Sequence, residues 1–145
     1  MLVRHSDWQF LLQEFLLRAQ YKPFSYGSHD CCLFVADAIN VMTGFDPAAE
    51  FRGRYHSRFG ALRQIFAHGG RSVGDVAAYV ARQCGFSEDV PMRARRGDMV
   101  LMEVRTDYGD SAAGIVGLNG ASAIIVTEMG LWCVHLQFAS RAWHV

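Results

Sequence analysis

The sequence predicts an α+β protein, with helices in the first 85 residues and an antiparallel sheet after them. Apolar residues recur at helical spacing up to about Gly85, whereas short β-rich runs separated by Gly, Asn and Asp follow Pro91. The connections Asn119-Gly120 and Met129-Gly130 are too short to contain a crossover helix, so neighbouring strands should run antiparallel. Helices followed by a segregated antiparallel sheet are typical of the α+β class.

Four helices are expected before residue 90, each with apolar residues on one face and a capping or breaking residue at an end. They run from Asp7, as the cap, to about Gln20; from about Cys31 to Thr43, with Gly44 after it; from Ser57 through Ala67; and from Ser72 to about Cys84. In the last of them, Ser72-Val73-Gly74-Asp75 resembles a capping box with Asp in the reciprocal role.

Five strand-like runs are expected in the last fifty or so residues, because each is short, rich in β-branched or aromatic residues and bounded by turn residues. They are residues 98–104, 113–118, 123–127, 131–136 and 142–145.

Length and composition indicate one folded domain over residues 1–145. Hydrophobic residues make up 51% of the chain, which excludes a disordered protein. The 14 basic and 14 acidic residues cancel, so no global charge favours nucleic acid or an anionic membrane. We therefore expect neither a nucleic-acid partner nor membrane insertion.

The four cysteines are expected to remain thiols, because the N-terminus lacks the pattern of a signal peptide and the protein should be made in a reducing cytoplasm. Cys31 and Cys32 are adjacent, and Cys84 and Cys133 stand alone. This spacing lacks the paired CxxC motifs of structural zinc sites, so no metal and no cofactor are expected.

The chain is organised around residues 26–37, where a polar turn runs directly into the apolar helix that begins at Cys31. The free N–H groups and the dipole at a helix N-terminus lower the pKa of a thiol placed there, which makes it a nucleophile. Asp30 or Ser28 is the expected cap. The alternative is a buried cysteine on a core helix. Cys32 lies on the apolar face of the helix, so we expect Cys31 to face the sheet and Cys32 the helical core.

Two motifs carry a resemblance to the NlpC-type, papain-like cysteine peptidases. Asp30-Cys31 matches the pair that opens the central helix in that family, and Gly97-Asp98-Met99-Val100 matches its first sheet strand. The resemblance implies a papain-like fold, in which N-terminal helices precede a C-terminal antiparallel sheet or half-barrel. It also implies that Cys31, rather than Cys32, is the nucleophile.

Nearly the whole chain also resembles a small phage and prophage family of NlpC-like proteins encoded among tail genes. The matching segments are residues 23–31, 43–47, 51–55, 96–98 and 141–143. This resemblance implies a component of the virion tail that is made in the bacterial cytoplasm. Its partners would be other tail-tip proteins, and peptidoglycan is a candidate substrate.

The chain departs from the peptidase pattern at the catalytic base. The His-Val-Gly-Ile-like run of the family reads Ala112-Ala113-Gly114-Ile115 here, so Ala112 occupies the position of the His. Residues 123–126 offer no polar side chain to orient a base. His135, on a later strand, is our nominee for a relocated base; the alternative is a strand His bonded to backbone. His29 either raises the thiolate fraction of Cys31 or serves the turn.

Two function hypotheses follow. In the first, the protein is a structural or assembly component of a phage tail with a degenerate cysteine-hydrolase site. In the second, it is an active cysteine peptidase or amidase that cleaves peptidoglycan stem peptides during DNA entry, using Cys31 and His135.

Two groups of residues have two possible roles each. Arg52, Arg54, Tyr55 and Arg58 either line an anion-binding groove or pair within the domain, and Trp8, Trp132 and Trp143 belong to a ligand platform or to the core or an interface.

Overall fold

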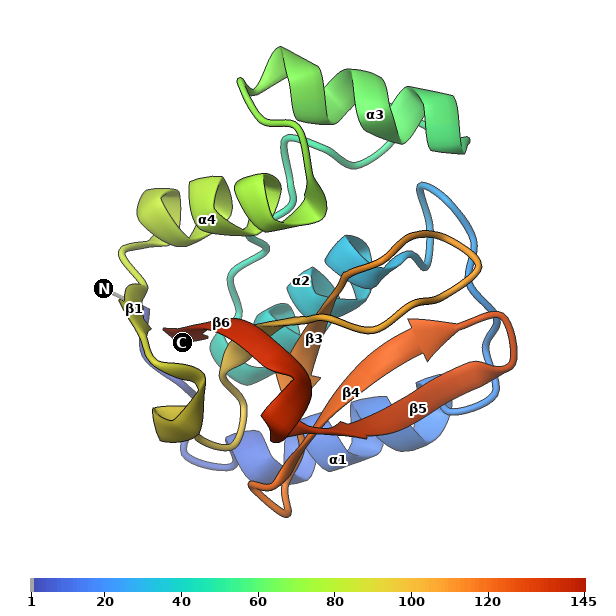
Figure 1. Ribbon diagram of the computed structural model, residues 1–145. Helices are drawn as coiled ribbons and strands as arrows, with labels where there is room; N and C mark the ends of the chain where they lie inside the picture. Colours follow the sequence, from blue (N-terminus) through green and yellow to red (C-terminus); the bar gives the residue numbers. More distant parts are fainter. Residues whose placement is uncertain (1) are drawn as a thin grey trace.

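The computed structural model describes residues 2–145 and confirms the α+β class. Figure 1 shows the helices gathered on one side of a single sheet. The helices are α1 (Trp8–Ala19), α2 (Cys31–Thr43), α3 (Arg58–Ala67) and α4 (Val73–Cys84). The strands are β1 (Ser87–Asp89), β2 (Met99–Met102), β3 (Ala112–Val116), β4 (Ser122–Thr127), β5 (Gly130–His135) and β6 (Ala139–His144), and the 3-10 helices are η1 (Pro91–Arg93) and η2 (Leu136–Phe138). No helix in this part of the chain has both the length and the apolar character that crossing a membrane requires.

The six strands form one sheet in the order β1-β6-β2-β3-β4-β5, and every adjacent pair is antiparallel. The sequence did not predict β1, which lies before Pro91 and pairs with β6 at the edge. Its residues, Ser87-Glu88-Asp89, are polar and too few to show a strand pattern, so only the pairing with β6 identifies them as a strand.

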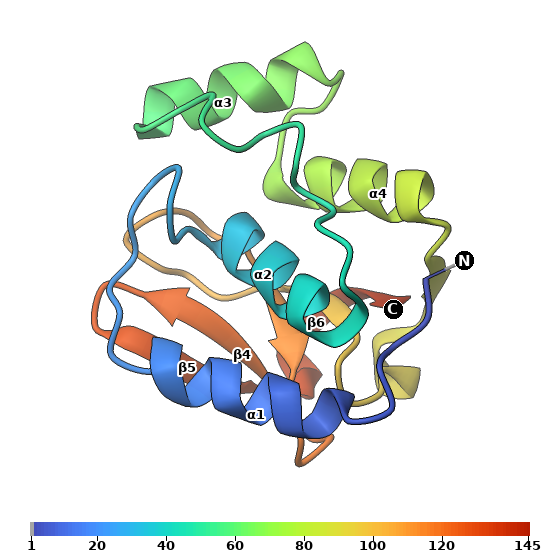
Figure 2. The same cartoon turned by 180° about the vertical axis from the view of Figure 1, so that it is seen from behind.

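Apolar side chains on the two faces of the central strands form two separate cores, because successive strand residues point to opposite sides. Met99 and Leu101 of β2 face the helices and join the main core with Phe34 and Ile39 of α2. Val100 and Met102 join a second core on the far face. Helix α1 packs beside α2, with Phe15 stacked on Phe34 at 5.6 Å between ring centroids (Figure 2).

Three helices begin at a side-chain cap: Asp30 accepts a hydrogen bond from the Leu33 amide, Ser57 from that of Gly60, and Ser72 from that of Asp75. Asp75, the reciprocal residue of the expected capping box, accepts a hydrogen bond from the Arg71 amide at 2.7 Å, and the Ser72 amide also contributes to lowering the pKa of its carboxyl. The expected cap at Asp7 is wrong, because its side chain makes no capping hydrogen bond.

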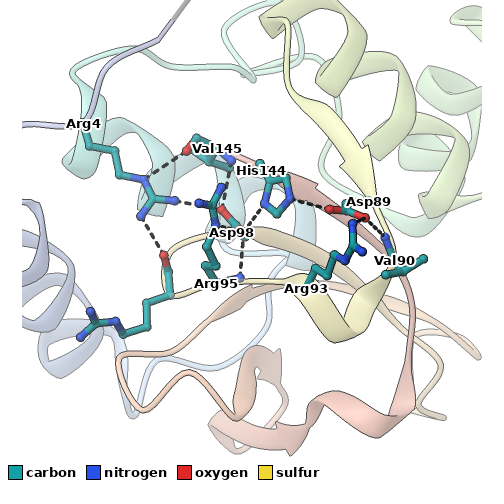
Figure 3. A network of polar contacts seen from close by, with 9 residues as sticks. Arg4, Asp89, Val90, Arg93, Arg95, Asp98, His144 and Val145 are labelled. Carbon is teal, nitrogen blue, oxygen red and sulfur yellow. Dashed lines mark hydrogen bonds and ion pairs between the residues drawn. The ribbon is translucent and has the colours of Figure 1, made fainter.

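A buried carboxylate, that of Asp98, connects the start of β2 with both ends of the chain (Figure 3). It accepts hydrogen bonds from Arg4 Nη2 at 3.0 Å, from the Arg95 amide at 2.8 Å and from the Val145 amide at 3.2 Å. His144 Nδ1 lies 2.7 Å from the same carboxylate, and His144 Nε2 lies 3.2 Å from Asp89. The Gly-Asp motif therefore has a clear structural role.

The pKa of His144 is raised above its ordinary value of 6.5, chiefly by the hydrogen bond to Asp98. Its stabilising charge is fully present below that ordinary value and is lost as the pH rises through the raised pKa of the folded protein. We expect urea denaturation to show stability falling as the pH rises above about 6.5, and His144→Gln to flatten that fall. The exposed His135→Gln serves as the control, and an equally steep fall in His144→Gln would contradict the assignment.

Candidate functional site

The thiol site begins at the Asp30 carboxylate, which fixes the start of α2. Oδ1 accepts from the Leu33 amide at 2.9 Å, while Oδ2 accepts from the Gly27 amide at 3.0 Å and from the Tyr55 hydroxyl at 2.5 Å. Gly27 has φ of 81°, and a Cβ there would lie 2.0 Å from the Tyr55 carbonyl oxygen, so only glycine fits this turn. The predicted cap is present, and it leaves Cys31 as the first helical residue.

The Cys31 sulfur faces the sheet, as predicted. It lies 4.0 Å from the Cys32 sulfur, and either thiol can donate to the other, while the main-chain N–H groups of Ala113 in β3 and of Cys32 stabilise its charged form. These donors, the Cys32 thiol first, lower the pKa of Cys31 even though burial and Asp30 oppose the charge. The pKa of Cys32 is raised well above its usual range, because it donates to Cys31 and is itself desolvated. Of the two adjacent thiols, the site therefore ionises Cys31 more readily than Cys32.

A cavity of about 120 Å³ lies beside Cys31, between the start of α2, the inner faces of α3 and α4, and the sheet. Its lining is mainly aliphatic and aromatic, and its few polar residues include Asp30, Gln64 and Ser111. Near the thiol, Phe24 stacks on Tyr108 with ring centroids 3.6 Å apart. The cavity therefore suits an apolar group better than a charged one.

No imidazole lines this cavity within residues 2–145. Ala112, which the resemblance places at the position of the base, lies on the cavity wall and is only 4% exposed. A methyl group can neither accept the proton of a thiol nor return one to a leaving amine.

The structure does not bring His135 to Cys31, so the nomination of His135 as a relocated base is wrong. Continuing the β3–β4 register places Ala113 level with Val126, whereas His135 pairs with Ser122 at the other end of β4. That difference is about 13 Å along the strand and about 10 Å across two strand spacings. His135 is exposed, and its Nδ1 accepts from the Gln137 amide at 3.0 Å, which matches the alternative of a strand His bonded to backbone.

His29 does not activate the thiol either. Its side chain is 2% exposed, lies edge-on to Phe34 with centroids 5.9 Å apart and is not part of the cavity lining. Burial lowers its pKa, which favours the neutral ring, and its Nε2 has no hydrogen-bond partner among the described residues. Of the two roles considered for His29, the structure supports one in the turn.

Of the three arginines among residues 52–58 that could bind an anion or pair within the domain, one forms ion pairs and two are exposed. Arg52 pairs with Asp46 and Asp37 within the domain, while Arg54 and Arg58 are exposed. Sequence reasoning missed the contact between Tyr55 and Asp30, which are 25 residues apart. No local pattern predicts a contact of that kind.

The described residues contain no group of three His, Cys, Asp or Glu side chains placed to hold a metal ion. The profile of the DUF6950 family, described as a domain of unknown function, matches residues 3–145. The chain therefore belongs to that family. None of the curated proteins matches this chain.

We expect Cys31 to be alkylated by iodoacetamide with a rate midpoint at lower pH than Cys84, whose pKa is raised by burial. Mass spectrometry of peptides from the folded protein, quenched over a range of pH, measures both midpoints in one sample. Cys31→Ser identifies the Cys31 signal. Equal midpoints, or a lower one for Cys84, would contradict the stabilised thiolate.

We expect Tyr55→Phe to destabilise the fold by about 1.5–3 kcal/mol, because it removes a hydrogen bond to a buried charged carboxylate. Urea denaturation measures the change, and Tyr21→Phe, on an 81% exposed ring, is the matched control. Equal effects of the two substitutions would show that the Tyr55 hydroxyl contributes nothing to stability.

Proposed function

We propose that this member of the DUF6950 family is a structural or assembly component of a phage tail, with an NlpC-type, papain-like fold and a thiol site that does not hydrolyse peptides. The proposal that the site does not hydrolyse peptides is supported by one observation. The thiol lies on the wall of a cavity whose lining contains no histidine, and Ala112 occupies the position of the base.

Peptide hydrolysis needs a nucleophile and also a group that protonates the leaving amine and then activates water. Cys31 meets the first requirement, but the neighbouring polar groups do not meet the second. The Asp30 carboxylate already accepts three hydrogen bonds, and the Tyr55 hydroxyl donates to it. The pKa of Tyr55 is raised by burial and by the charge of Asp30, so this phenol does not ionise near neutral pH.

The tail assignment rests on the resemblance of nearly the whole chain to phage and prophage tail proteins. The element order supports the NlpC-type assignment: α2 opens with Asp30-Cys31, and Gly97-Asp98 leads into β2. In this proposal the protein is made in the bacterial cytoplasm and is built into the virion beside other tail-tip proteins. Neither nucleic-acid binding nor membrane insertion is part of its role.

A second candidate function is a cysteine peptidase or amidase that acts on peptidoglycan stem peptides. The lowered pKa of Cys31 favours it, because two main-chain amides and the Cys32 thiol stabilise the nucleophilic form of the sulfur. This candidate needs a proton donor from the substrate or from another protein.

We expect the purified protein to release no peptides from peptidoglycan, because the leaving amine receives no proton. Chromatography of the soluble fraction after incubation measures the release. Cys31→Ala should leave particle assembly and infection intact, which plaque counts on complemented host cells measure.

Release by the wild-type protein that disappears with Cys31→Ala would overturn the structural proposal and establish the second candidate. His135→Ala is the matched control, since an exposed His at the far end of the sheet should not change any activity. Loss of assembly with Cys31→Ala, without any peptide release, would show that the thiol itself is needed in the particle.

A further inference from the structure

Helix α3 presents an apolar face to solvent. It stands at the outer edge of the molecule above α4 in both ribbon views, and none of its residues is buried (Figures 1 and 2). Phe59, Leu62 and Phe66 are 71%, 39% and 62% exposed. Their spacing of i, i+3 and i+7 places them along one stripe, about 10 Å long, on the side of the helix away from the cavity.

The stripe is flanked by positive charge. Arg58 and Arg63 lie on either side of it at helical spacing, and both are exposed. No Asp or Glu occurs between residues 51 and 74. Within residues 2–145, the guanidinium groups of Arg54, Arg58, Arg63 and Arg71 have no carboxylate within 4.0 Å. An apolar helical ridge with basic borders fits an apolar groove with an acidic rim.

The same chain carries such a groove elsewhere. A hollow of about 190 Å³ lies between the β4–β5 hairpin and residues 104–108. The apolar part of its lining consists of Val104, Ile125, Met129 and Trp132. Its lining also contains two carboxylates, Asp107 and Glu128, neither of which has an ion-pair partner in the described chain. Arg105, also in its lining, is paired with Asp110 at 3.4 Å. Trp132 and Met129 are 57% and 79% exposed, so the hollow is open.

We infer that α3 of one copy docks into this hollow on a second copy, in a head-to-tail contact. The Phe59–Phe66 stripe would cover Trp132 and Met129, and Arg58 and Arg63 would meet Asp107 and Glu128. Thr106 and Tyr108 line both the hollow and the cavity beneath α3, whereas the stripe lies on the side of α3 away from that cavity. Both surfaces are exposed and face different directions, so the contact forms between chains rather than within one.

Such a contact is heterologous, because each copy offers two different surfaces. It repeats from copy to copy and either closes into a ring or extends into a filament. The inference goes beyond the proposed function, since neither surface includes Cys31 and the contact is independent of any chemistry at the thiol.

Sedimentation velocity of the purified protein, from micromolar to millimolar concentration, tests the contact. We expect species larger than the 16.2 kDa monomer, in proportions that rise with concentration. Phe59→Ser with Phe66→Ser removes the ridge, and Asp107→Lys with Glu128→Lys removes the acidic rim. Each double variant alone should be monomeric. Phe10→Ser with Leu17→Ser, on exposed α1 positions, is the matched control and should associate like the wild type.

A mixture of the ridge variant and the rim variant distinguishes this contact from others. One intact ridge and one intact hollow remain, so the mixture should form a species of two copies and nothing larger. A mixture that stays monomeric while the wild type associates would overturn the head-to-tail contact in favour of a symmetric one. A monomeric wild type at every concentration, or a ridge variant that associates like the wild type, would also overturn it.

Vesicles of phosphatidylglycerol provide the remaining comparison, because a basic aromatic helix also suits an anionic lipid surface. In that case the wild-type protein would stay monomeric but sediment with these vesicles, and the ridge variant would not. This outcome would show that the α3 stripe binds an anionic membrane and not a second copy of the chain. Circular dichroism confirms that each variant is folded.

Discussion

The geometry of the thiol site depends on the hydrogen bonds to one carboxylate, that of Asp30. It joins the Gly27 turn, the first turn of α2 and Tyr55 of the following loop, so three segments are fixed by one side chain. Its negative charge also raises the pKa of the neighbouring Cys31. The Cys32 thiol and the main-chain amides outweigh that effect, so the thiolate is stabilised by local donors instead of by a positive side chain.

The second constraint is the sheet register, which Asp98 helps to hold. Its carboxylate joins Arg4, the start of β2 and the end of β6, so both ends of the chain are tied to the strand beside β3. Register decides which main-chain amide meets the Cys31 sulfur, because a shift of one residue turns every side chain to the other face. In β3 it places the Ala113 amide at the sulfur and Ala112 on the cavity wall.

The sequence predicted the starts and ends of helices, because these depend on residues that are close together in the chain. Asp30, Ser57 and Ser72 cap helices within three residues of themselves, and Gly44 ends α2 with φ of 77°. The errors concern contacts between distant residues. The polar strand β1 is recognisable only from its partner β6, and the Tyr55–Asp30 contact leaves no local pattern. The register that separates His135 from Cys31 is likewise set by strand pairing and not by neighbouring residues.

Helix α3 belongs both to the cavity beside Cys31 and to the exposed apolar surface. Its inner residues, including Ala61 and Ile65, line the cavity beside Cys31, whereas its outer stripe faces solvent. Because no residue of α3 is buried, little apolar contact holds it against the body, and elements of this kind open at low free-energy cost. A contact that orders the outer face of α3 would therefore also stabilise the wall of the cavity. The same ten-residue helix therefore contributes both to the cavity wall and to the exposed apolar stripe.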